Sequence, residues 1–269
     1  MFWGAKSRFH DLNDVVNVLN PKSVEFHLTD EDIKSGKIDG THNLSYSIHL
    51  PEYWEQQIIN PCNSNKLNEH LDIYRLCIEK GLSFKNNFIK EKMKVVIHPG
   101  GMTVDPIEEN TDEIIGNLYK NIKEFVDSLP FKDDIEILIE NMPPLPWFYG
   151  GQYYSNIFCD PKEIRTFCNV TGYNICLDIS HLGLYCNYKK TNLLESINML
   201  KPYVKQIHLA DAEGTSGEGV PIGEGNVDFK AVMNEIKDLD IAVIPETMWG
   251  HKNKYAGFKQ VIDVCSQYI

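Results

Sequence analysis

The sequence predicts an α/β protein, a closed (β/α)8 TIM barrel built as a single domain over residues 1–269. Eight short apolar runs recur along the chain, and helices or helix-length connections separate them, which is the pattern of a parallel sheet. Eight such repeats within about 250 residues fit a closed barrel, with an open doubly wound sheet as the competing fold. The predicted strands cover residues 2–5, 23–28, 44–49, 94–98, 135–140, 174–178, 204–208 and 241–246.

Helical periodicity appears in most of the connections between these strands. Apolar residues recur there three or four positions apart, so each segment can bury one face against a sheet. The connection over residues 30–43 is short and polar, which makes it the weakest of the predicted helices. The other predicted helices cover residues 12–19, 66–80, 111–125, 193–200, 229–236 and 258–265, and a further helix is predicted to begin at Pro161.

Capping residues support three of these helices. Asn110 and Glu113 resemble a capping pair at the start of the helix that follows them. Asp160 is placed as an N-cap before a first-turn proline, and Asp228 is placed as the cap of a later helix.

Composition limits the classes of function. The chain has 26 Lys and Arg residues against 38 Asp and Glu residues, a formal charge of −12. This acidic balance disfavours nucleic acid as a partner, because nucleic-acid binding needs a basic surface. It suits a soluble protein that acts on a small molecule. The sequence leaves the oligomeric state open, and a homo-oligomer remains one alternative.

The cysteines and the N-terminus indicate a compartment. The seven cysteines form no CxxC or CxxH pair, which argues against a thiolate zinc site and for reduced thiols in the core. No targeting signal is visible, and no apolar stretch approaches the length of a membrane span. We therefore expect a cytoplasmic protein with no membrane partner.

Six consecutive predicted strands end at a histidine or a carboxylate. In a barrel the carboxyl ends of the strands gather at one mouth, so these side chains are expected to converge. Packing several carboxylates together without a cation would cost several kcal/mol, and a bound divalent ion removes that cost. Mixed nitrogen and oxygen ligands suit Zn²⁺, Mn²⁺, Co²⁺ or Fe²⁺ better than Ca²⁺. The six residues are His49, His98, Glu140, Asp178, His208 and Glu246.

Several motifs resemble one known superfamily. They are IHPGG at 97–101, IEN at 139–141, LDISHLG at 177–183, IHLAD at 207–211, IGEGNVDF at 222–229 and PET at 245–247. In order and spacing they resemble the xylose isomerase-like TIM-barrel superfamily, which contains sugar isomerases, epimerases and the endonuclease IV enzymes. The resemblance implies a shared metal site at Glu140, Asp178, His208 and Glu246.

The isomerase and epimerase branch is the preferred reading. It implies one divalent ion, Zn²⁺ or Mn²⁺, beside a sugar or sugar derivative. Glu140 and Glu246 would both bind the ion and move the substrate proton. The chemistry agrees, because an ion next to a hydroxy-carbonyl group acidifies the adjacent C–H bond.

The endonuclease IV branch is the alternative. There His49 and His98 match ligands of a second metal, which would make a two-metal phosphodiesterase or AP endonuclease. His181 matches a ligand of a third metal, but an Asp-x-His sequence that completes that site is replaced here by Gly217, Glu218 and Gly219. The third site is therefore not expected.

Four residues are predicted to contact the substrate. His181 would bind a hydroxyl group, and Trp147 would form a wall for a sugar in the aromatic loop after residue 140. Lys6, beside Arg8 at the end of the first strand, could take a phosphate or carboxylate tail. Asn141 is predicted to orient a ligand or to meet the substrate beside Glu140.

Overall fold

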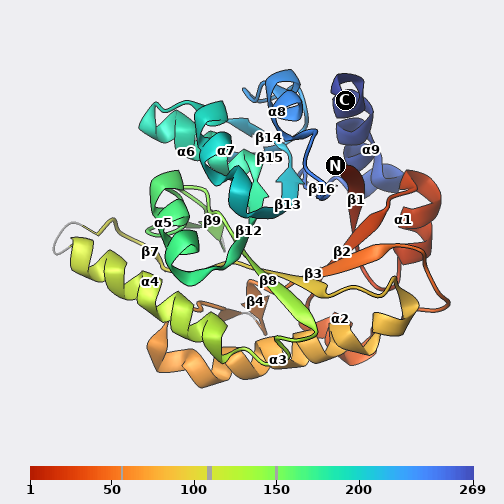
Figure 1. The fold of residues 1–269 in the computed structure, drawn as a ribbon, viewed down its shortest axis with the longest axis horizontal. Helices are drawn as coiled ribbons and strands as arrows, with labels where there is room; N and C mark the ends of the chain where they lie inside the picture. Colours follow the sequence, from red (N-terminus) through yellow and green to blue (C-terminus); the bar gives the residue numbers. More distant parts are fainter. Residues whose placement is uncertain (56, 108–110, 149–150) are drawn as a thin grey trace.

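Eight parallel strands close into a barrel in the computed structural model, which describes residues 1–55, 57–107, 111–148 and 151–269 (Figure 1). The strand order is β1-β16-β13-β12-β8-β6-β3-β2, and the sheet is closed. The predicted TIM barrel is therefore confirmed, and the competing open sheet is not formed. The strands are β1 (Phe2–Ser7), β2 (Ser23–His27), β3 (Ser45–His49), β6 (Met93–Ile97), β8 (Ile135–Glu140), β12 (Asn174–Asp178), β13 (Val204–Leu209) and β16 (Ala242–Pro245).

The register brings the ends of neighbouring strands to similar heights. His27 pairs with His49 between β2 and β3, and Asp178 pairs with His208 between β12 and β13. Because side chains alternate along a strand, a residue two positions before a strand end faces the same side of the sheet. The barrel interior is therefore built in layers, with the polar strand ends above a second layer two residues earlier.

That second layer is apolar on one side and polar on the other. Val96, Leu138 and Cys176 form a separate buried cluster, two residues before His98, Glu140 and Asp178 respectively. The polar side consists of three buried residues two positions before His27, His49 and His208, namely Glu25, Ser47 and Gln206. Buried charge therefore lies beneath only part of the barrel mouth.

Helices surround the barrel (Figure 1). They are α1 (Leu12–Leu19), α2 (Asp30–Ser35), α3 (Leu67–Ser83), α4 (Thr111–Ser128), α5 (Pro161–Thr171), α6 (Ile179–Lys189), α7 (Leu193–Leu200), α8 (Phe229–Ile236) and α9 (Lys252–Cys265). Four 3-10 turns accompany them, η1 (Ser64–Lys66), η2 (Lys85–Asn87), η3 (Lys201–Tyr203) and η4 (Ser266–Tyr268). None of the described helices is long and apolar enough to cross a membrane.

The sequence-based caps can be compared with the structure. Asp160 and Asp228 cap α5 and α8 through their side chains, as predicted. The weak connection after β2 contains the six-residue helix α2, which Thr29 and Asp32 close with a capping box. Asn110 lies outside the described residues. Helix α6 was not predicted, because its LDISHLG start follows a strand directly and carries no separate cap signal.

Short antiparallel ribbons occupy the connections that follow four barrel strands. Their pairs are β4 (Tyr53–Trp54) with β5 (Gln57–Ile58), β7 (Met102–Thr103) with β11 (Tyr154–Ser155), β9 (Trp147–Phe148) with β10 (Gly151–Gln152), and β14 (Asp211–Glu213) with β15 (Gly217–Val220). Each ribbon begins after the carboxyl end of a barrel strand, so the four supply the walls around the mouth. All seven cysteines are free and buried, in agreement with the expected reduced thiols.

Candidate metal centre

Four ligand-type side chains converge at the mouth of the barrel. Each offers one oxygen or nitrogen atom, and these atoms lie within 4.8 Å of one another. The group consists of Glu140 at the end of β8, Asp178 at the end of β12, His208 in β13, and Glu246 just after β16. All except Glu246 are at most 1% exposed.

His208 lies between carboxylates on both sides of its ring. Its Nδ1 is 3.3 Å from Glu140 Oε1 and 2.5 Å from Glu246 Oε2, while its Nε2 is 3.0 Å from Glu25 Oε2. Burial alone would lower the pKa of His208, but the surrounding carboxylates outweigh it and raise that pKa well above the usual range. A proton on Nε2 bound to Glu25 leaves Nδ1 free to face an ion.

The carboxylates have divergent pKa values. Burial raises the pKa of Asp178 to about 7, and the charges of Glu140 and Glu246 add to this effect. Burial also disfavours ionisation of Glu140 and Glu246. For both, the charge of His208 overcomes that penalty and holds the pKa well below its usual range. Lys6 contributes at Glu246, because its ammonium group forms an ion pair with that carboxylate.

The donors fit a divalent transition-metal ion. Glu246 Oε2 is buried without a hydrogen-bond partner although His208 Nδ1 is 2.5 Å away, as expected for two atoms aimed at a common cation. Three carboxylates and one imidazole give mixed oxygen and nitrogen ligation, which suits Zn²⁺, Mn²⁺, Co²⁺ or Fe²⁺. The aggregated negative charge of the three carboxylates would be costly without a cation.

A second group adjoins the first and shares Glu140. His49, His98 and Glu140 also bring ligand atoms within 4.8 Å of one another. The Nε2 atoms of both imidazoles face Glu140 Oε2, at a distance of 3.1 Å for His49 and 3.4 Å for His98. Since Glu140 Oε1 faces His208, the two oxygens of one carboxylate point into two different groups.

His181 lies beside both groups without belonging to either. It sits in the first turn of α6, where its Nδ1 is 2.8 Å from the Asn141 carbonyl oxygen. Its Nε2 is 3.1 Å from Glu218 Oε1 in β15. The glutamate that replaces the expected Asp-x-His sequence is therefore the partner of His181.

Asn141 contacts the neighbouring strand. Its side-chain oxygen accepts the Asp178 N–H at 2.7 Å, and its amide donates to the Asp178 carbonyl oxygen at 3.0 Å. Asp178 Oδ1 in turn accepts the His181 N–H at 2.6 Å and caps α6. Asn141 thus fixes the backbone of Asp178, and its role toward an ion or a substrate stays a prediction.

Asp211 organises the loop that carries Glu218. The Asp211 carboxylate accepts N–H groups from Gly223, Gly225 and Val227 at 2.9–3.0 Å. A side chain at Gly225 would place its Cβ 2.3 Å from Asp211 Oδ1, so the IGEG motif needs glycine for this close approach. The motif stabilises the loop and leaves Asp211 out of both ligand groups.

Two cavities open beside Glu246, Glu218 and Met248. One, about 310 Å³, has an aromatic wall formed by Tyr53, Trp147 and Phe148 and reaches His98 and His181. The other, about 210 Å³, contains Lys6 and Asp178 and extends to Trp249 and His251. The predicted substrate residues Lys6, Trp147 and His181 therefore all lie at these cavities.

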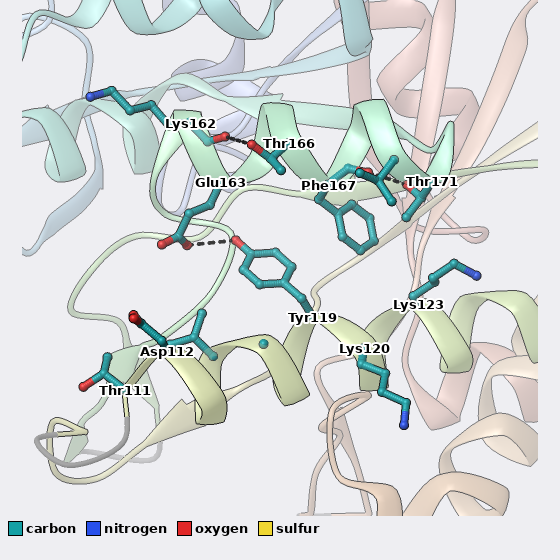
Figure 2. Close-up of a pocket in the computed structure, with 13 residues that line it drawn as sticks. Thr111, Asp112, Tyr119, Lys120, Lys123, Lys162, Glu163, Thr166, Phe167 and Thr171 are labelled. Atoms are coloured by element: carbon teal, nitrogen blue, oxygen red, sulfur yellow. Dashed lines mark hydrogen bonds between the residues drawn. The ribbon is translucent and has the colours of Figure 1, made fainter.

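A larger cavity of about 640 Å³ lies between α4 and α5 on the outside of the barrel (Figure 2). There Tyr119 reaches across from α4, and its hydroxyl donates to Glu163 of α5 at 3.1 Å. None of the residues of the two ligand groups lines it.

Three acidic residues of the site were missed in the sequence. Glu25 could have been found, because a charged residue two positions before a strand end faces the barrel interior. Glu52 lies in the connection after β3 and Glu218 in the short strand β15, where no periodicity in the sequence indicates the direction of a side chain. Glu52 Oε1 is 3.4 Å from His98 Nδ1.

Comparison with known proteins defines the class. The model of the xylose isomerase-like TIM barrel family matches residues 22–267, so this chain belongs to that family. Two uncharacterized proteins of Methanocaldococcus jannaschii are similar in sequence. One is 25% identical over 215 residues, covering 75% of this chain and 69% of the relative. The other is 26% identical over 211 residues, covering 75% of each chain.

Solved structures share the fold at low sequence identity. A D-tagatose 3-epimerase-like protein superposes with a TM-score of 0.65 at 19% identity, covering 99% of both chains. Endonuclease IV from Thermus thermophilus gives a TM-score of 0.66 at 14% identity, covering 100% of this chain and 98% of that one. An L-ribulose 3-epimerase gives 0.60 at 13% identity, covering 99% and 94%. At such identities the likeness establishes the fold alone.

Proposed function

We propose that the protein is a divalent-metal-dependent isomerase or epimerase that acts on a sugar or sugar derivative. One observation carries the proposal. Glu140 and Glu246 approach the same imidazole nitrogen, at 3.3 Å and 2.5 Å from His208 Nδ1. Two carboxylates at one ion-binding position can remove a proton from a bound substrate and return it.

The residues divide the work as follows. Glu140, Asp178, His208 and Glu246 would hold the ion, which when bound supplies a Lewis acid that polarises a substrate carbonyl. One glutamate takes the proton from the adjacent carbon, and the C–H electron pair moves toward the carbonyl oxygen. Return of a proton to the opposite face gives the epimer, and return to the neighbouring carbon gives the isomer. The lowered pKa values of both glutamates keep them in the proton-accepting form.

Positioning falls to neighbouring residues. Lys6 holds the Glu246 carboxylate through its ion pair, and Asn141 fixes the backbone of Asp178. His181, with Nε2 directed toward the 310 Å³ cavity wall at Glu218, is placed to hydrogen-bond a substrate hydroxyl. Trp147, 60% exposed at the same cavity, can cover one face of a sugar.

A two-metal phosphodiesterase is the second candidate. The group of His49, His98 and Glu140 favours it, because a one-metal isomerase does not require that group as ligands. Elemental analysis separates the two: about one ion per chain supports the isomerase, and about two supports the phosphodiesterase. Cleavage of a DNA duplex that contains an abasic site would establish the second candidate.

Solvent-deuterium exchange tests the first candidate. The metal-loaded protein is incubated with ketoses and aldoses in D2O, and incorporation at carbon is followed by NMR. Glu246→Gln is expected to reduce incorporation by about 10²–10⁴-fold, the usual contribution of a general base. Glu163→Gln, a matched substitution in the outer α4–α5 cavity, should leave the rate unchanged. Retention of both metal binding and full exchange in Glu246→Gln would contradict the assignment.

A further inference from the structure

Carboxylates outnumber lysine and arginine side chains at the two cavities beside Glu246. The acidic residues that line them are Glu52, Asp178, Glu218 and Glu246. Among the described residues that line either cavity, Lys6 is the single lysine or arginine. The residues outside the described ranges, at 56, 108–110 and 149–150, include no lysine or arginine in the sequence.

Lys6 and Arg8, the two cations near the end of β1, are already paired with carboxylates. Lys6 contacts Glu246 directly, and its Nζ is 3.7 Å from Glu25 Oε1. Arg8 binds Asp32 at 2.8 Å and the His27 carbonyl oxygen, and it lines neither cavity. An anionic substituent would have to separate one of these pairs before it could bind Lys6 or Arg8. Lys252, a further cation beside the 210 Å³ cavity, lies over the Trp249 ring at 4.0 Å from its centroid.

The imidazoles that face the larger cavity are paired with carboxylates in the same way. His98 Nδ1 is 3.4 Å from Glu52 Oε1, and His181 Nε2 is 3.1 Å from Glu218 Oε1. Glu52 lies in the connection after β3, and Glu218 lies in β15. Each therefore places a carboxylate where the part of a substrate farther from the metal ligands would lie.

Phosphate recognition needs the opposite arrangement. A phosphate dianion is bound by arginine forks, lysines or clustered backbone N–H groups, and a like charge at close range rejects it. One divalent ion supplies two positive charges, fewer than the three carboxylates that would bind it. The ion and its three carboxylate ligands would therefore together keep a net negative charge.

We infer that the substrate is an uncharged polyhydroxylated compound, a free sugar rather than a sugar phosphate or sugar acid, and that Glu52 and Glu218 set this specificity. This inference rests on the proposed function and adds the charge of the substrate to it. Carboxylate oxygens and imidazole nitrogens suit hydroxyl groups, which both donate and accept hydrogen bonds. The aromatic wall of Tyr53, Trp147 and Phe148 suits the apolar face of a sugar.

Matched pairs of substrates test the inference. Solvent-deuterium incorporation is measured for D-fructose against D-fructose 6-phosphate and for D-xylulose against D-xylulose 5-phosphate. The free ketose of at least one pair should exchange at least about 100-fold faster than its phosphate ester, the scale of discrimination that a repelled charge produces. Equal or faster exchange of the phosphate esters would overturn the inference.

Binding separates failure of this inference from failure of the proposed reaction. If no compound exchanges, the proposed reaction is wrong, and calorimetric titration with D-glucitol and D-glucitol 6-phosphate then decides the charge preference. Tighter binding of D-glucitol upholds the inference. Tighter binding of the phosphate, or binding of neither, overturns it.

Charge variants identify the responsible residues. Glu218→Lys and Glu52→Lys should each raise the exchange rate of the phosphate ester relative to that of the free ketose by about tenfold, since each reverses one nearby charge. If no compound exchanges, each variant should raise the affinity for D-glucitol 6-phosphate relative to D-glucitol by the same factor. Glu218→Gln should give a smaller change in the same direction. Lys120→Glu, on the outer face of α4, is the control and should change neither ratio. No shift in the Glu52 and Glu218 variants would exclude them as the specificity residues.

Discussion

The outer cavity of this protein differs in size and in chemical content from the two cavities at the barrel mouth. The outer cavity is the larger and lies between α4 and α5 (Figure 2). Two of its lysines pair with acidic residues on their own helix, Lys120 with Glu124 and Lys123 with Asp127. The smaller cavities at the barrel mouth gather charged groups from five different strands and loops. Cavity volume therefore does not indicate the candidate functional site here, whereas the convergence of polar strand ends does.

The physical difference is desolvation. At the mouth, Glu140 and His208 are 0% exposed, and their charges act on one another with little solvent screening. In the outer cavity, Lys120 and Lys123 are solvated, and such pairs contribute little to stability. The contrast predicts that substitutions at the mouth change metal binding, while those in the outer cavity do not.

The largest effect is expected for Glu140. Its two oxygens face both ligand groups, so Glu140→Gln should abolish the rise in melting temperature that Zn²⁺ or Mn²⁺ produces in the parent protein. A ligand at 100 times its Kd stabilises a fold by about 2.7 kcal/mol, which is measurable by thermal unfolding. If Zn²⁺ or Mn²⁺ raised the melting temperature of Glu140→Gln as much as that of the parent protein, the claim that metal binds at the mouth through Glu140 would be contradicted.

Acidification should weaken metal binding strongly. The pKa of Asp178 is raised to about 7, and that of His208 lies well above its usual range, so both hold protons in the metal-free protein at pH 6. An ion must displace these protons, and each one costs about a tenfold loss in affinity per pH unit below its pKa. Apparent affinity, measured by competition with a chelator, should therefore fall steadily from pH 8 to pH 6. A flat profile would show that neither group is a ligand.

Glu25 should have an intermediate effect. It accepts the His208 Nε2 proton from below the mouth at 3.0 Å, and loss of such a partner usually weakens metal affinity 10–100-fold. Glu25→Gln is therefore expected to lower affinity within that range. Chelator competition measures it, and Glu136→Gln, at the opposite end of β8, serves as the comparison. Equal metal affinities in Glu25→Gln and Glu136→Gln would show that Glu25 does not support His208 in metal binding.

The smallest effect is expected in the outer cavity. The Tyr119 hydroxyl accepts the Phe158 N–H at 3.0 Å and donates to Glu163, so Tyr119→Phe removes two hydrogen bonds. Its free energy of unfolding should fall by about 1–2 kcal/mol, measured with denaturant. Metal affinity should stay unchanged. A loss of metal binding in this variant would link the two regions and contradict their separation.

Much of the barrel could be predicted from the sequence, because eight short apolar runs are separated by helix-length segments and six consecutive runs end in a histidine or a carboxylate. Because the carboxyl ends of barrel strands converge, the sequence also predicted that His49, His98, Glu140, Asp178, His208 and Glu246 would gather at one mouth. The structure brings all six strand-end residues into the two ligand groups. Their roles as ligands remain predictions.

The remainder depended on tertiary contacts. Helix α6 was missed because Asp178 serves both as the strand end and as the N-cap, so no extra residue marks the helix start. Glu52 and Glu218 were missed because loop side chains have no periodicity, and their directions follow from ribbons such as β14–β15. Lys6 lies at the expected mouth, but only the structure shows its pairing with Glu246 and Glu25.

The most direct test is a crystal structure of the protein grown with zinc or manganese, with the ion located by anomalous scattering. The account predicts one peak bonded to Glu140, Asp178, His208 Nδ1 and Glu246 at about 2.0–2.2 Å. A well-ordered barrel mouth in which these side chains turn away from one another, with no ion among them, would contradict it.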